Sequence, residues 1–313
     1  MTKIAFVFPG QGAQSVGMMT AWGDYQSKVK ETYAQASDVL GYDLWKLVSE
    51  GPEERLNQTE MTQPAMLCAG VASWKIAAQQ HEIPDVSLMA GHSFGEYSAL
   101  VCAQSLDFES AVKLVAKRGQ LMQSAVGPGK GSVAVILGLD DDAVIEACAR
   151  VQEGIVEATN FNAPGQVAIA GHKASVDAAL ENARAMGAKR TLPLAVSVPS
   201  HSSLMKDAAA ELFEALDSTH FSMPKIPIIH NQNAAIAQSV DEIKQLLTRH
   251  LYQPVRWAEG VREMYAQGIG CLVECGPGKV LSGLTRRIEK SMRTQAVFDA
   301  ASLESTIHFF SEY

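Results

Sequence analysis

Apolar and polar positions follow two different periods along the first 126 residues. Short, wholly apolar runs are typical of buried strands, and apolar positions that recur every three or four residues indicate amphipathic helices. Strand patterns cover residues 3–8 and 86–90, and helix patterns cover most of 25–80, a segment that begins at 96, and 108–124. Asp107 stands where a side chain would cap the last helix. The alternation predicts an α/β domain with a mostly parallel sheet.

The pattern changes after the turn-rich stretch 127–131, which reads Gly-Pro-Gly-Lys-Gly. The elements expected next are a strand at 132–137, a helix at 140–151, strands at 155–160 and 166–170, a helix at 173–186 and a strand at 189–194. The order β-α-β-β-α-β is that of the ferredoxin-like split unit. We therefore expect a ferredoxin-like subdomain at 127–196, inserted into a domain made of 1–126 and 197–313.

The α/β pattern resumes from residue 197. Strands are expected at 226–230 and 269–275, and helices at 203–216, 239–250, 257–267 and 278–290. The tail after Arg293 gives no informative pattern.

Composition narrows the class of protein. Hydrophobic residues make up 47% and charged residues 19% of the 313 positions, as in a globular enzyme. The net charge of −8 argues against general nucleic-acid binding. No apolar run is long enough to span a membrane, and the first residues lack the layout of a signal peptide. The five cysteines include no C-x-x-C pair, so we expect reduced thiols in a cytoplasmic protein.

The most informative motif is Gly91-His92-Ser93-Phe94-Gly95, which reads G-x-S-x-G between a predicted strand and a predicted helix. A strand that turns sharply into a helix exposes the middle serine, and a side chain at either glycine would crowd the turn. Ser93 is therefore the candidate nucleophile for acyl chemistry. His92 is expected to pack behind the turn, because successive side chains of an extended segment point opposite ways.

A serine needs a base, and His201 is the strongest of eight histidines. It lies in a small polar loop between a predicted strand and a predicted helix, where catalytic groups concentrate. The alternative is that it merely caps the helix that begins near Ser203. The sequence contains no metal-ligand spacing such as H-E-x-x-H, so no metal is expected.

Arg118 falls on the apolar side of the helix 108–124, in line with Ala111, Leu114 and Val115. A buried guanidinium is costly unless an anion meets it. One interpretation is an internal salt bridge, for example to Glu96. The other is a site for a substrate carboxylate, which arginine can hold with two parallel hydrogen bonds. Gly119 beside it would allow another segment to approach closely.

Together these motifs resemble the malonyl-CoA:acyl carrier protein transacylases, the acyltransferase family of fatty-acid and polyketide synthesis. The resemblance covers nearly the whole chain to about residue 290. It rests on Phe8-Pro9-Gly10-Gln11-Gly12, Thr62-Gln63-Pro64-Ala65, Gly91 to Glu96, Arg118-Gly119, Asn160 to Gln166, Val198-Pro199-Ser200-His201 and Gly276-Pro277-Gly278. It implies a hydrolase-like α/β domain that carries a ferredoxin-like insertion.

The resemblance also implies roles. Ser93 would carry the malonyl group as an ester, and His201 would act as general base and then as general acid. The backbone N–H groups of Gln11 and Phe94 would form the oxyanion hole. Arg118 would hold the malonyl carboxylate.

Asn162 and Met122 are the further substrate-binding positions that the resemblance implies. Serine hydrolases usually orient the histidine with a carboxylate, but this family uses a backbone carbonyl or a glutamine, and His250 stands at that glutamine position. Its carbonyl could still fix His201, whereas a role for its side chain is doubtful.

The implied substrates are malonyl-CoA and the phosphopantetheine thiol of an acyl carrier protein, with no cofactor and a monomeric enzyme. The alternatives are a trans-acting polyketide acyltransferase and a serine acyl hydrolase. A dinucleotide-binding module is a further alternative, because Gly10-Gln11-Gly12 follows a strand, but Ser15 replaces the third glycine of that fingerprint. The basic clusters Arg286-Arg287-Lys290 and Lys189-Arg190 could meet an acidic carrier or could be ordinary solvated faces.

Overall fold

The computed structural model describes residues 3–127, 129–194, 196 and 198–312. Its larger sheet has five strands in the order β7-β2-β1-β8-β9, and every neighbouring pair is parallel. These strands are β1 (Lys3–Phe8), β2 (Val86–Gly91), β7 (Ile228–Ile229), β8 (Ile269–Cys275) and β9 (Arg293–Val297). The predicted mostly parallel sheet is therefore confirmed.

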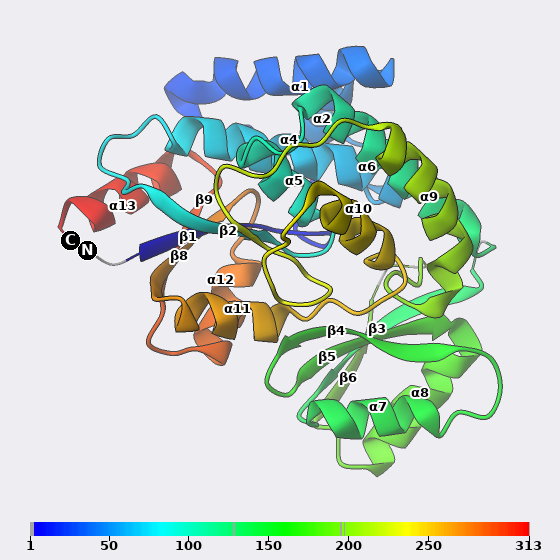
Figure 1. Ribbon diagram of the computed structural model, residues 1–313. Helices are drawn as coiled ribbons and strands as arrows, with labels where there is room; N and C mark the ends of the chain where they lie inside the picture. Colours follow the sequence, from blue (N-terminus) through cyan, green and yellow to red (C-terminus); the bar gives the residue numbers. More distant parts are fainter. Residues whose placement is uncertain (1–2, 128, 195, 197, 313) are drawn as a thin grey trace.

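Helices cover both faces of this sheet (Figure 1). Along β1, Ile4, Phe6 and Phe8 join the larger hydrophobic core, whereas Ala5 and Val7 face a second core with α11 and α12. This strict alternation is what a strand buried on both faces produces. The larger core packs α1 (Gln26–Leu40), α2 (Leu44–Glu50), α4 (Thr59–Ala77), α5 (Gly95–Cys102), α6 (Phe108–Ala125), α9 (Lys206–Ser218), α10 (Val240–Arg249) and α13 (Ala300–Ser311).

The second face carries α11 (Trp257–Ala266) and α12 (Val280–Ile288), which lie below the sheet in Figure 1. Three short helices complete the domain: η1 (Gly23–Tyr25), α3 (Glu53–Leu56) and η2 (Ser203–Met205). The Asp107 side chain accepts a hydrogen bond from the Ser110 N–H at 2.9 Å, so it caps α6 as expected.

A four-stranded antiparallel sheet forms a separate layer with its own core. Its elements are β3 (Gly131–Leu137), α7 (Asp141–Ala149), β4 (Val156–Ala163), β5 (Gln166–His172), α8 (Lys173–Ala185) and β6 (Arg190–Pro193). The strand order β4-β5-β3-β6 is that of a ferredoxin-like unit, and α7 and α8 cover its outer face (Figure 1). The boundaries at 126/127 and 196/197 stay predictions, and residue 197 lies outside the described residues.

The carboxyl-terminal tail, for which no element is predicted, forms β9 and the helix α13. β9 forms an edge of the large sheet, and Asp299 caps α13 in a reciprocal capping box with Ser302. The aspartate followed three residues later by a polar partner is the signal that could have revealed this helix. The strand expected at 226–230 is shorter than predicted and keeps only Ile228–Ile229.

Candidate active site

Ser93 lies at the turn between β2 and α5, and its φ of 52° is in the left-handed region. That backbone is strained for a residue with a side chain. A Cβ added to Gly91 would lie 2.0 Å from the Gly95 carbonyl carbon, and one added to Gly95 would lie 2.4 Å from the Phe8 carbonyl oxygen. Only glycine fits at both positions, so the expected tight turn is confirmed.

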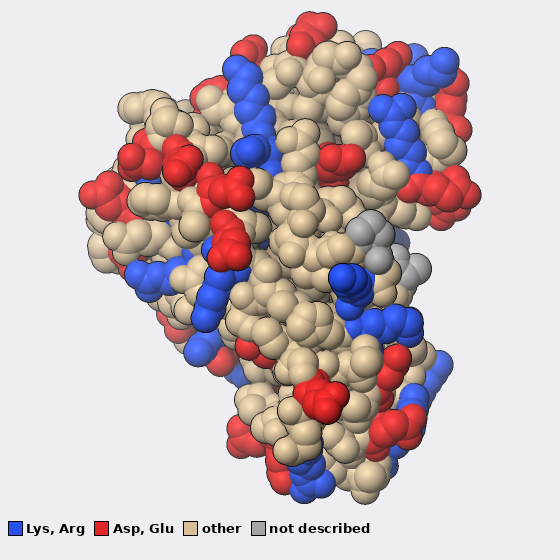
Figure 2. Space-filling model, turned by 90° about the vertical axis from the view of Figure 1, so that its right-hand side faces the viewer, with Lys and Arg blue, Asp and Glu red and all other residues tan. Residues whose placement is uncertain are grey.

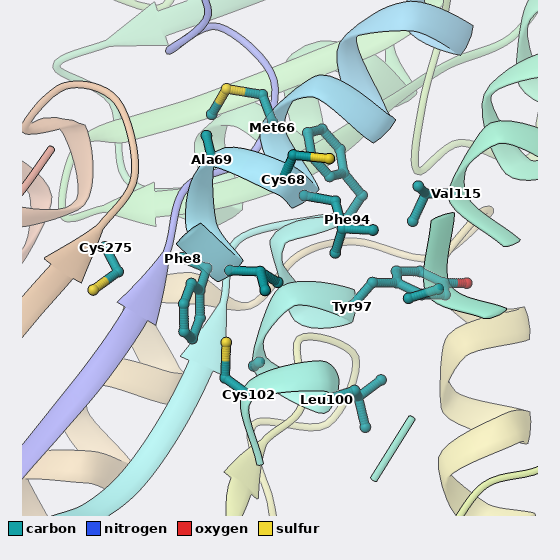
Figure 3. Close-up of a cluster of buried hydrophobic side chains, with 14 of the residues drawn as sticks. Phe8, Met66, Cys68, Ala69, Phe94, Tyr97, Leu100, Cys102, Val115 and Cys275 are labelled. Carbon is teal, nitrogen blue, oxygen red and sulfur yellow. The ribbon is translucent and has the colours of Figure 1, made fainter. Parts of the chain in front are cut away.

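The helix that follows Ser93 is anchored in the larger core. Phe94, Tyr97 and Leu100 are at most 1% exposed, and Figure 3 shows them among side chains from β1, α4 and α6. Close-packed surroundings resist displacement. The packing of these side chains in the core therefore keeps α5 in place and helps to maintain the strained backbone at Ser93.

Ser93 and His201 meet in the structure. Ser93 Oγ lies 2.7 Å from His201 Nε2, and His201 Nδ1 lies 2.6 Å from the main-chain carbonyl oxygen of His250. A carbonyl oxygen only accepts, so Nδ1 carries the proton and Nε2 can accept from the serine hydroxyl. The His201 N–H also donates to the Leu251 carbonyl at 2.9 Å. One loop thus fixes both the backbone and the ring of His201.

The orienting contact from His250 is made by its main chain. Its ring lies 4.8 Å from the His201 ring, and neither ring nitrogen has a hydrogen-bond partner among the described residues. Burial holds the pKa of His250 well below its usual value. Burial is also the main cause that lowers the pKa of His201 to about 3, and the positive charge of Arg118 acts in the same direction. Both rings are therefore neutral at neutral pH.

One cleft gathers the candidate residues. Ser93 and His201 line it with the five predicted substrate-binding residues Gln11, Phe94, Arg118, Met122 and Asn162. The small sheet contributes Val133, Val135, Asn160 and Ala168 to the lining as well as Asn162. Neither the Gln11 nor the Phe94 N–H donates any of the turn or loop hydrogen bonds found among the described residues. Both could therefore serve an oxyanion.

His92 does not pack behind the turn, so that expectation is wrong. It lines the same cleft as Ser93, and its Nε2 lies 2.7 Å from Asn162 Oδ1. The residues after β2 have left the extended conformation, so the alternation of side chains no longer applies. Burial lowers the pKa of His92, which keeps this ring neutral as well.

Arg118 is buried on α6, with 1% of its surface exposed. Its Nη1 donates to Gln63 Oε1 at 2.9 Å, whereas Nε and Nη2 have no hydrogen-bond partner among the described residues. No ion pair found among those residues involves Arg118. The internal salt bridge to Glu96 that the sequence left open does not form.

Glu96 instead belongs to a buried network that the sequence analysis missed. His230 Nδ1 lies 2.6 Å from Glu96 Oε1, and the Asn231 N–H donates to Glu96 Oε2 at 3.0 Å. The Asn231 side chain also donates to Glu96 and, at 2.7 Å, to the Gly91 carbonyl oxygen. Burial alone would raise the pKa of Glu96, but His230 and Asn231 outweigh it and hold the pKa below its usual value. No local sequence motif predicts this network, because its residues come from segments that are far apart along the chain.

Among the described residues, no group of three or more His, Cys, Asp or Glu side chains could hold a metal ion. Within the same ranges, no helix is both long enough and apolar enough to cross a membrane. The cysteines at 68, 102, 148, 271 and 275 are all buried thiols.

Each of the two predicted basic clusters contributes one residue to a single groove. Lys189 and Arg287 line it together with Pro164 and Gly165. Arg287 also donates to Gln166 Oε1 and to the Pro164 carbonyl oxygen. On the face drawn in Figure 2, acidic and basic side chains are interspersed, and no broad field of one sign appears.

Comparison with known proteins places this geometry in a family. A family model described as an acyl transferase domain matches residues 5–306. The malonyl CoA-acyl carrier protein transacylase of Haemophilus influenzae is 50% identical over 310 residues, which cover 99% of each chain. That of Bacillus subtilis is 40% identical over 314 residues, covering 100% of this chain and 98% of the other.

Solved structures agree. An acyl carrier protein S-malonyltransferase from Vibrio cholerae has a TM-score of 0.93 and 52% identity, covering 97% of this chain and 100% of that one. A malonyl-transacylase in complex with its type II polyketide-synthase acyl carrier protein has a TM-score of 0.96 and 50% identity, covering 98% of this chain and 100% of that one. The expected family is confirmed: this chain belongs to the acyl transferase domain family.

Proposed function

We propose that this enzyme transfers the malonyl group from malonyl-CoA to the phosphopantetheine thiol of an acyl carrier protein, through a malonyl ester on Ser93. One observation carries the choice of acyl group. Arg118 places a buried positive charge with two unpartnered nitrogens in the cleft that also holds Ser93 and His201. A short acyl group that ends in a carboxylate satisfies that charge, whereas an uncharged one leaves it unpaired.

In the first half-reaction, Ser93 Oγ attacks the thioester carbonyl while His201 Nε2 takes the hydroxyl proton. The N–H groups of Gln11 and Phe94 stabilise the oxyanion. The tetrahedral intermediate then collapses, the C–S bond breaks, and His201 returns the proton to the leaving thiol. The carbonyl oxygen of His250 stabilises the transient imidazolium through Nδ1.

In the second half-reaction the carrier thiol gives its proton to His201 and attacks the ester, which releases Ser93. The chemistry is the reverse of the first half, so the same groups serve both. Asn162, held against His92, and Met122, beside Arg118, line the acyl site. We infer that the reaction needs no cofactor and that the enzyme is cytoplasmic and monomeric.

Mass spectrometry of the intact protein tests the proposal. Incubation with malonyl-CoA should add one malonyl group at Ser93, and a phosphopantetheinylated acyl carrier protein should remove it. The Ser93→Ala variant should gain nothing. Malonyl transfer by Ser93→Ala at the wild-type rate would overturn the mechanism.

The two alternatives have their own readouts. A serine acyl hydrolase would release free malonate at the transfer rate when no thiol acceptor is present. A trans-acting polyketide acyltransferase would prefer a polyketide carrier over a fatty-acid carrier when both are offered at equal concentration. We expect slow hydrolysis and a preference for the fatty-acid carrier.

A further inference from the structure

Arg118 is held in place by a neutral side chain. Gln63 on α4 is fully buried, and its Oε1 accepts the hydrogen bond from Arg118 Nη1 at 2.9 Å. The other end of its amide, Nε2, lies 3.6 Å from Met122 Sδ. Gln63 therefore bridges two residues that line the cleft, although it does not line the cleft itself.

The position of Gln63 is fixed by the close approach of two helices. A Cβ added to Gly119 on α6 would lie 2.5 Å from Glu60 Cα and 2.9 Å from the Thr59 carbonyl oxygen. Gln63 lies one turn after Thr59 on α4. The close approach of the two helices therefore brings the side-chain amide of Gln63 within hydrogen-bond reach of Arg118. Glycine beside the arginine thus allows the contact that the glutamine makes.

The contact leaves a particular pair of nitrogens unused. A guanidinium grips a carboxylate with two parallel N–H groups, and Nε and Nη2 form such a side-on pair. These are the two Arg118 nitrogens without partners among the described residues. Nη1, which lies outside that pair, is the one bonded to Gln63.

The chemistry of the Gln63 side chain matters as much as its position. An amide oxygen fixes the guanidinium without cancelling its charge, whereas a carboxylate of nearly the same shape would form an ion pair. The carboxylate of Glu96 does not compete, because it is bonded to His230 and Asn231. Arg118 therefore has no ion-pair partner among the described residues, and its charge stays available to the carboxylate of an acyl donor.

We propose that Gln63 is a specificity-determining residue of this enzyme. It positions Arg118 through Nη1 and, because it is neutral, leaves the arginine charge and the Nε–Nη2 pair to the carboxylate of the acyl donor. The proposal rests on the proposed function, in which Arg118 holds that carboxylate. It gives the Thr62-Gln63-Pro64-Ala65 motif a role in choosing the acyl group.

The test compares two acyl donors that differ only in the carboxylate, malonyl-CoA and acetyl-CoA, on the full chain with acyl carrier protein as acceptor. Gln63→Glu should lower the malonyl-to-acetyl ratio of kcat/KM at least tenfold, mainly through a higher KM for malonyl-CoA. If Gln63 had a merely structural role, the substitution would lower kcat/KM for both donors by the same factor. An unchanged ratio in folded Gln63→Glu would therefore overturn the proposal.

Two further variants complete the experiment. Gln63→Met keeps the volume and removes the acceptor, so the ratio should fall about threefold or more. If Gln63→Glu does not fold, Gln63→Met decides, and an unchanged ratio again overturns the proposal. Gln58→Glu adds the same charge at an exposed position at the start of α4, and it should leave the ratio as in the wild type.

Arg118→Ala separates this proposal from the proposed function. If it lowers the ratio while Gln63→Glu and Gln63→Met do not, only the role of Gln63 fails. If Arg118→Ala also leaves the ratio unchanged, the carboxylate site itself is wrong, and both proposals fall.

Discussion

The backbone N–H of Ser93 donates a hydrogen bond to Asn231 Oδ1 at 3.1 Å, across 138 positions of sequence. The same asparagine donates to the Gly91 carbonyl oxygen, so it holds the turn on both sides of the serine. Because the Ser93 N–H is used here, the N–H of Phe94 is the one that the turn offers to an oxyanion. A buried side chain outside the cleft thus maintains the geometry of the nucleophile.

Replacing Asn231 by alanine should weaken both the fold and the reaction. The change removes donors from the Gly91 carbonyl and from the ionised Glu96, and buried groups left without partners cost about 3 kcal/mol. We expect the free energy of unfolding in urea to fall by about that amount and kcat to fall about tenfold or more. Asn233→Ala, at an exposed position nearby, should change neither by much. An Asn231→Ala variant as stable and active as the wild type would exclude this role.

The side chain of His250 should be dispensable for the reaction. The contact to His201 comes from the main-chain carbonyl, and the buried ring nitrogens have no partners among the described residues. We expect His250→Leu to keep kcat within about threefold of the wild type. His201→Ala should lower kcat by about a hundredfold or more, because it removes the base. Steady-state kinetics of the two variants check this, and a comparable loss in both would show that the His250 ring takes part.

The free energy of unfolding should decrease as the pH falls, and His201 should contribute to this decrease. Burial and Arg118 lower the pKa of this imidazole to about 3 in the folded protein, against 6.5 for an unperturbed histidine. Between these values the unfolded chain binds a proton that the folded chain does not. The free energy of unfolding therefore decreases as the pH falls through this window, by up to about 1.4 kcal/mol per pH unit for this group.

Urea unfolding at pH 7 and pH 5 measures this effect. The loss of stability between the two pH values should be smaller in His201→Gln than in the wild type, because the variant lacks the group that titrates. An equal loss in both proteins would mean that His201 is already protonated in the fold or keeps an ordinary pKa.

Two glycine-to-alanine replacements should have opposite effects on the stability of the fold. Gly95→Ala places a Cβ 2.4 Å from the Phe8 carbonyl oxygen, where backbone must move, and we expect at least about 3 kcal/mol of destabilisation and loss of acylation. Gly283→Ala on α12 meets nothing within 4 Å and should stabilise by about 0.5–1 kcal/mol, since alanine favours the helix. Thermal unfolding of both variants decides. An equal effect from the two changes would contradict the crowding argument.

The tail shows where local pattern reading failed. The start of α13 carries a capping signal in Asp299 and Ser302 that the sequence analysis overlooks. β9 is a strand of five residues at the edge of a parallel sheet and has little periodicity of its own. Its place is decided by pairing with β8 from Cys271–Arg293 to Cys275–Val297. The inserted unit could be predicted from the sequence, because its strands and helices alternate in an order that few folds share.

The sequence by itself determined most of the elements before the tail, the order of the inserted unit, and the turn at Ser93, because these depend on neighbours in the chain and on glycines that no other residue can replace. Only the tertiary structure decided the partners of the buried charges. Glu96 pairs with His230 and Asn231, and Arg118 with the neutral Gln63. The reason is that the cost of burying a charge is offset by whichever groups the fold brings close, and these come from segments far apart along the chain.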